Sequence, residues 1–147
     1  MAGETAFTRG KTSVSKLDSA WRERLIDAEI LLKAERWPSA LAMGLYAVEI
    51  LLKVKICKHL DLDMLPEAFQ FHDLVSLLRC SGLSRRITSP DADRVNANWE
   101  LIQALSKELN NLRYGDHSTI DRTRAIELFA SINDPNHGVL SWISTQM

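Results

Sequence analysis

A polar cluster near residue 113 holds the side chains of this chain that are best suited to chemistry. The stretch Asn110-Asn-Leu-Arg-Tyr-Gly-Asp-His117 interrupts a core-forming helical pattern and places Arg113 and His117 four residues apart. If the helix continues through Gly115, both side chains lie on one face. A guanidinium binds a phosphate through two parallel hydrogen bonds, and an imidazole can take or give a proton at neutral pH. We therefore predict Arg113 and His117 as catalytic residues.

The reaction that this pair could support is metal-independent cleavage of RNA. A base removes the proton of the ribose 2′-hydroxyl, while a cation stabilises the charge that builds on phosphorus. One arginine and one histidine lack a second proton-transfer group, so the mechanism needs two copies of the chain. A symmetric dimer that brings both copies together would provide them. The pattern thus predicts a homodimer.

A structural role is the alternative for Arg113. The segment 39–57 reads as one apolar helix, with Tyr46, Glu49 and Lys53 at helical spacing on one face, so that a carboxylate and a phenol lie in an apolar surround. A buried carboxylate is costly unless it is paired. Arg113 suits this pairing, and Tyr46 or Asn110 could complete a hydrogen-bond network. The expected supporting cluster consists of Tyr46, Glu49, Asn110 and Tyr114.

Other polar and aromatic groups have simpler explanations. His72 and Asp73 are expected to cap the helix that follows them, because a carboxylate suits the positive end of a helix. The four tryptophans are spaced as core or interface anchors rather than as a base-stacking platform. Two arginine pairs could form a local anion-binding patch, although charged surface faces explain them about as well; they are Arg85-Arg86 and Arg122 with Arg124.

Composition narrows the function classes. Of the 147 residues, 46% are hydrophobic and 25% charged, as in ordinary globular proteins, and the net charge is −1. Any contact with nucleic acid must therefore come from a local patch. Cys57 and Cys80 lack metal-ligand spacing, and there is no glycine-rich phosphate loop, so we expect neither metal nor cofactor. No apolar run is long enough for a membrane span, which favours a cytoplasmic protein.

Helical periodicity and capping residues predict an all-α fold without strands. Residues 1–14 are expected to be disordered, and residues 15–147 to form one domain. Short connections favour an up-and-down bundle of four to five helices. The expected helices start near residues 15–18 and then cover 38–59, 72–80, 89–114, a segment from about 118, and 139–143, with a loop at 84–88.

Three segments occur in an order typical of one family of helical domains. They are an Ala/Tyr-rich helix ending in Leu-Leu-Lys at residues 36–53, a His-Asp-Leu helix start at 71–78, and Asn-Leu-Arg-Tyr at 111–114. Together they resemble the HEPN domain family (higher eukaryotes and prokaryotes nucleotide-binding domain) over roughly residues 17–130. The resemblance implies a compact helical bundle that is usually dimeric.

Many proteins of this family are ribonucleases in toxin–antitoxin, phage-defence or RNA-processing systems, and others accompany nucleotidyltransferases. The active branch carries a histidine after four to six residues that follow the arginine, often with a tyrosine two places later. Here three residues separate Arg113 from His117, and Thr119 holds the place of that tyrosine. The Arg113-Tyr114 pair is closer to the nucleotidyltransferase-associated branch.

The leading expectation is a small module that acts on or with RNA or nucleotides, for example a metal-independent ribonuclease of toxin or defence type. The alternative is a non-catalytic interaction bundle that partners a nucleotidyltransferase, an antitoxin or another protein, with Glu49 and Arg113 as a structural pair. A third class is a nucleotide-binding regulator.

Overall fold

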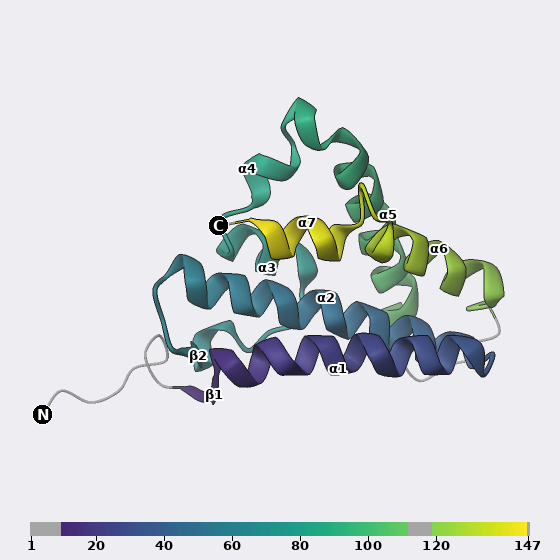
Figure 1. Cartoon of the computed structure of the whole chain (residues 1–147), viewed down its shortest axis with the longest axis horizontal. Coiled ribbons are helices and arrows are strands. Elements are labelled where there is room, and N and C mark those ends of the chain that lie inside the picture. Colours follow the sequence, from purple (N-terminus) through teal and green to yellow (C-terminus); the bar gives the residue numbers. More distant parts are fainter. Residues whose placement is uncertain (1–9, 112–118, 147) are drawn as a thin grey trace, which may run out of the picture.

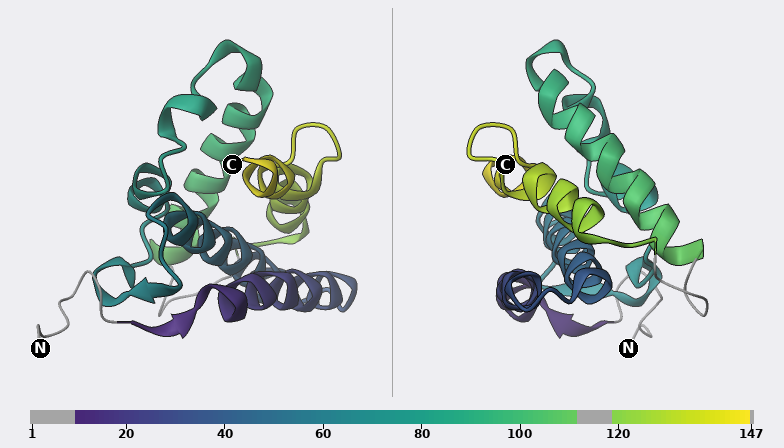
Figure 2. Two further views of the ribbon diagram at one scale, coloured as in Figure 1. Left: turned by 60° about the vertical axis from the view of Figure 1, so that its left-hand side comes forward. Right: turned by 90° about the vertical axis from the view of Figure 1, so that its right-hand side faces the viewer.

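The computed structural model describes residues 10–111 and 119–146, and these residues form an all-α bundle, as predicted (Figure 1). Within the described part, four helices have 12 residues or more. They are α1 (Val14–Lys33), α2 (Trp37–His59), α5 (Asp93–Asn111) and α6 (Arg122–Asn133). Figure 2 shows α5 standing at a steep angle to the paired α1 and α2, with α6 and α7 beside it.

The first two helices form an antiparallel hairpin. Ser13 caps α1 by accepting a hydrogen bond from the backbone N–H of Lys16. A turn at residues 34–36, with Glu35 at a φ of 60°, reverses the chain. Pro38 then lies in the first turn of α2, where its missing N–H costs nothing, as the sequence predicted.

Helix α2 is the central element of the bundle. Thirteen of its 23 residues are buried, and it packs against α1, α3, α5, α6 and α7. Each fully buried leucine of its core face stabilises the fold by about 1.5–3 kcal/mol. Gly44 allows close approach to α6, because a Cβ there would lie 2.9 Å from the Leu128 side chain. The long helix therefore holds its polar residues in a rigid, apolar frame.

A small sheet departs from the prediction. Strand β1 (Gly10–Ser13) pairs antiparallel with β2 (Met64–Pro66), so Ser13 lies opposite Met64. The prediction that residues 1–14 are disordered is therefore wrong for residues 10–14. Residues 1–9 lie outside the described residues. Strands of three and four residues are too short to show an alternating pattern, and their backbone pairing is visible only in three dimensions.

Between α2 and α5 the chain makes short elements. A 3₁₀ turn, η1 (Glu67–Phe69), precedes α3 (Leu74–Cys80), which is capped by Asp73 and ends before Gly82 at a φ of 80°, as predicted. The predicted loop at 84–88 instead contains α4 (Ser84–Ile87). Ile87 is buried and anchors this turn to the core, a tertiary contact that local sequence does not reveal.

The second half follows the predicted order. A 3₁₀ turn, η2 (Pro90–Ala92), leads into α5, and Asp121 caps α6. The last helix, α7 (Val139–Thr145), packs on α2, α5 and α6. Among the described residues, no helix is both long and apolar enough to cross a membrane.

The turn between α6 and α7 is held by Asp134 and gives a pH-dependent prediction. Its carboxylate accepts backbone N–H bonds from His137 (2.7 Å) and Asn136 (2.8 Å), and these bonds lower the pKa of Asp134. Because the pKa is depressed in the folded state, this stabilisation is present above the unfolded pKa of about 4 and is lost as pH falls through the folded value. We expect Asp134→Ala to lower the melting temperature at pH 7, and the difference from wild type to shrink toward pH 3.

Thermal melts of both proteins across this pH range measure the effect. Asp134→Asn is the matched control, since its amide oxygen still accepts a hydrogen bond but does not titrate in this range. A difference between wild type and Asp134→Ala that stays constant with pH would show that the carboxylate charge does not contribute.

Candidate functional site

A pocket of about 300 Å³ lies between α2, the start of α3 and the last turns of α5. Apolar and polar side chains line it together, as in many small-ligand sites. Its lining residues are Ala42, Leu45, Tyr46, Glu49, His72, Leu74, Ser106, Leu109 and Asn110.

Glu49 is the buried acid of this pocket, with 9% of the residue exposed. Its Oε2 atom lies 3.3 Å from Nζ of Lys53, one helical turn later, and 3.1 Å from Nδ1 of His72. The Lys53 side chain is also buried, at 8% exposure. The buried carboxylate therefore has a cationic partner on its own helix and a second partner from the segment before α3.

The side chain of His72 is 79% exposed, unlike the buried side chains of Glu49 and Lys53. An ionised carboxylate only accepts hydrogen bonds, so Nδ1 of His72 carries the hydrogen that it donates to Glu49. In the neutral ring this tautomer leaves a lone pair on Nε2. A carboxylate that orients an imidazole in this way prepares the opposite nitrogen to act as a base.

The start of α3 positions His72. Asp73 is the helix cap, and its carboxylate accepts a hydrogen bond from the backbone N–H of Ser76 at 3.1 Å. The sequence predicted this cap correctly but gave His72 the same capping role. The structure instead turns His72 toward Glu49, 23 residues earlier in the chain. The sequence signal for this contact is the carboxylate of Glu49, which a buried face of α2 leaves in need of polar partners.

Three of the six predicted site residues line this one pocket: Tyr46, Glu49 and Asn110. The other three, Arg113, Tyr114 and His117, lie outside the described residues, as does the predicted pairing of Glu49 with Arg113. One expectation is corrected. Tyr46 is 47% exposed rather than enclosed in an apolar surround, although it lines the same pocket as buried Glu49.

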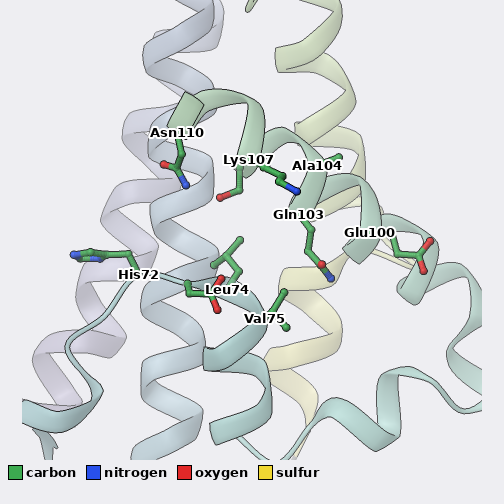
Figure 3. Close-up of a pocket in the computed structure, with 10 residues that line it drawn as sticks. His72, Leu74, Val75, Glu100, Gln103, Ala104, Lys107 and Asn110 are labelled. Atoms are coloured by element: carbon green, nitrogen blue, oxygen red, sulfur yellow. The ribbon is translucent and has the colours of Figure 1, made fainter. Parts of the chain in front are cut away.

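A second hollow, of about 470 Å³, adjoins the first and shares His72, Leu74, Ser106 and Asn110 with it. Figure 3 shows Gln103, Ala104 and Lys107 of α5 on one side of this hollow and the segment that begins α3 on the other. The two hollows together are called the groove from here on, and His72 belongs to the lining of both. The further charged residues of the groove are Asp73, Glu100 and Lys107.

The described residues of the groove offer acid–base and hydrogen-bonding groups. Among residues 10–111 and 119–146, no three His, Cys, Asp or Glu side chains are placed to hold a metal ion. Of the predicted anion sites, Arg124 is engaged with Glu108 at 3.3 Å and Glu127 at 3.8 Å, so its charge is already balanced. Both cysteines are free thiols, and burial raises the pKa of Cys57.

Comparisons of this chain with models of known protein families, with curated proteins and with solved structures found no match. The groove and its residues are therefore the basis for assigning a function.

Proposed function

We propose that this protein is a metal-independent endoribonuclease that binds RNA in the groove. The observation that carries the proposal is the pairing of buried Glu49 with exposed His72, which orients an imidazole beside a polar, solvent-open hollow. The resemblance to HEPN domains supports RNA as the substrate. Asn110 lines the groove, and Arg113 follows it by three residues in the sequence.

In this proposal His72 removes the proton of the ribose 2′-hydroxyl through Nε2. The oxygen then attacks the adjacent phosphorus, the 5′-oxygen leaves, and a 2′,3′-cyclic phosphate forms. His117 donates a proton to the leaving oxygen, and Arg113 stabilises the added negative charge on phosphorus. Two histidines in one chain would supply both proton-transfer groups that sequence analysis could find only in two copies.

The biological setting is proposed from the same resemblance. It favours a cytoplasmic homodimer in a toxin–antitoxin or defence system, with an antitoxin or a nucleotidyltransferase as protein partner. A dimer would place two grooves in one particle without changing the role of His72.

The test is RNA cleavage in EDTA. Wild type is expected to break single-stranded RNA and leave 2′,3′-cyclic phosphate ends, detectable by mass spectrometry. Arg113→Ala and His117→Ala are expected to reduce the rate by at least about 100-fold, the usual effect of removing a proton-transfer or charge-stabilising group. Cleavage that needs added metal, or that survives His117→Ala unchanged, would contradict the mechanism.

A non-catalytic interaction module is the second candidate. Two observations favour it: Glu49 already has Lys53 as a buried partner, and Ile26 and Ile30, one turn apart on α1, are 55% and 59% exposed. Exposed apolar side chains at this spacing form a typical helix-docking face. This candidate predicts no RNA breakdown by wild type in EDTA at any protein concentration.

A further inference from the structure

A second polar surface lies away from the groove, where the end of α2, helix α4 and the end of α7 meet. One hollow of about 460 Å³ is lined by Arg85, Arg86 and Trp142, together with smaller residues. A second, of about 80 Å³, is lined by Lys55, Lys58 and His59. Gln146 lines both hollows, so they are neighbours. In Figure 1 the C-terminal end of the chain lies between α4 and the end of α2.

Hydrogen bonds to the end of the chain fix this surface. Nζ of Lys55 donates to the carbonyl oxygens of Gln146 at 2.7 Å and Ser144 at 3.4 Å. Arg86 donates to Oε1 of Gln146 at 3.3 Å. Cations that are far apart in the sequence are therefore held around one residue in a built arrangement rather than scattered over a flexible surface.

Positive charge is in excess here. Lys55, Lys58, Arg85 and Arg86 line the two hollows, and Asp91 is the single carboxylate among the lining residues. Asp18 and Asp63 line a neighbouring hollow together with Lys58, and the charge of Asp18 also acts on Lys55. Among the described residues, no carboxylate lies within 4 Å of the charged groups of Lys55, Lys58 or Arg85.

The crowding of cations affects Lys55. Burial lowers the pKa of Lys55, and the nearby charge of Lys58 lowers it further, while Asp18 partly opposes both effects. An anion bound between these lysines would relieve that repulsion. Because the whole chain has a net charge of −1, this excess is a local feature.

Trp142 indicates which kind of anion fits. The sequence predicts Trp142 as a core or interface anchor, and its half-buried indole does pack against the hydrophobic core; it also lines the same hollow as Arg85 and Arg86. Proteins that bind single-stranded nucleic acid combine a positively charged surface with aromatic side chains on which bases stack. A free phosphate would use the cations but not the ring, whereas a nucleotide strand would use both.

We propose that Lys55, Lys58, Arg85, Arg86 and Trp142, named here the basic surface, bind single-stranded RNA and anchor the substrate of the groove. The choice of RNA rests on the proposed function. Ala92, at the end of η2 in the larger hollow, and Ser106 of α5, in the groove, are 14 residue steps apart, or about 21 Å at 1.5 Å per step. A strand of about seven nucleotides spans that distance even at the duplex rise of about 3.4 Å each.

Binding is tested with a fluorescein-labelled 12-nucleotide oligouridine in EDTA, measured by fluorescence anisotropy on His72→Ala protein so that the probe is not cut. Adding Lys58→Glu and Arg85→Glu is expected to weaken binding at least about tenfold and to lower the slope of log K against log salt by about 0.7 per lost phosphate contact. Trp142→Leu keeps an apolar side chain and is expected to weaken binding about fivefold or more. Arg85→Gln is a milder variant if the double change disturbs folding, which circular dichroism reports.

Lys33→Glu is the matched control, since it reverses an exposed charge at the far end of α1. Three outcomes would overturn the inference. In the first, Lys33→Glu weakens binding as much as Arg85→Glu; in the second, Trp142→Leu and the charge variants bind like His72→Ala protein without a further change. In the third, anionic lipid vesicles compete for binding as well as unlabelled oligouridine does. These outcomes are separable from the proposed function. If the basic surface binds RNA but wild type does not cleave it, the proposed ribonuclease activity is wrong and the RNA-binding surface stands. If Arg85→Glu cleaves the 12-nucleotide RNA at the wild-type rate, the basic surface does not anchor the substrate and the ribonuclease proposal stands.

Discussion

Replacing Glu49 by leucine is expected to lower the free energy of unfolding by about 3–5 kcal/mol. The carboxylate is buried, and its Oε2 lies 3.3 Å from the ammonium group of Lys53, whose side chain is 8% exposed. Removing the acid leaves Lys53 as a buried charge whose partner is gone, and such a charge costs far more than the pair itself contributes. Urea denaturation followed by circular dichroism measures the loss.

The double variant Glu49→Leu with Lys53→Met is the control for this interpretation. It replaces both charges by apolar groups of similar size, which is often neutral or stabilising for a buried pair. We therefore expect most of the lost stability to return, with a coupling energy of at least about 1 kcal/mol in the double-mutant cycle. If Glu49→Leu alone is as stable as wild type, the carboxylate is not a required partner of Lys53.

Replacing His72 by alanine is expected to reduce RNA cleavage by about 10²–10⁴-fold, the typical contribution of a general base. Stability should change by less than about 0.5 kcal/mol, because the side chain is 79% exposed and makes a single hydrogen bond, to Glu49. Single-turnover rates at saturating protein report the chemical step, and thermal melts report the fold. A large loss of activity without a loss of stability would identify His72 as a catalytic group rather than a structural one.

Two further variants make this test specific. His137→Ala changes a histidine in the turn before α7, outside the groove, and should cleave like wild type. Glu49→Gln keeps the size of the side chain and an oxygen that accepts the Nδ1–H bond of His72, but not the charge. It should leave Nε2 of His72 in place and lower the rate, because the imidazolium that forms on proton transfer is no longer stabilised by a carboxylate. Full activity in His72→Ala would assign the proton transfer to another residue. It would favour instead the mechanism in which two copies of the chain each supply one histidine.

Much of the fold could be predicted locally. The limits of α2 follow from Pro38 at its start and from an apolar run that ends near His59. Asp73 caps the helix that the sequence assigned to it, because cap formation depends on residues within one turn. Helix α4 and the β1–β2 pair were missed, since each is short and depends on contacts with distant parts of the chain.

The candidate site was predictable in part. Sequence periodicity identified Glu49 as a buried acid that needs a partner, and the four-residue step to Lys53 could have supplied one. His72 could not be assigned in this way, because it meets Glu49 only after the chain has left α2 and returned at the start of α3. The sequence offered Arg85 and Arg86 as an anion-binding patch but explained them about as well as surface charges. The tertiary structure adds Trp142 to their hollow and places Lys55 and Lys58 in the neighbouring one.

The amino-acid sequence alone determined that this protein is helical, where α2 begins and ends to within a residue, and that an acid on α2 would be buried among apolar side chains. Periodicity and caps act within a few residues, so they can be read along the chain. The tertiary structure decided which groups that acid meets, how the groove opens around His72, and which cations gather at Gln146. These contacts join residues more than twenty positions apart, and packing of the helices, rather than any local pattern, brings them together.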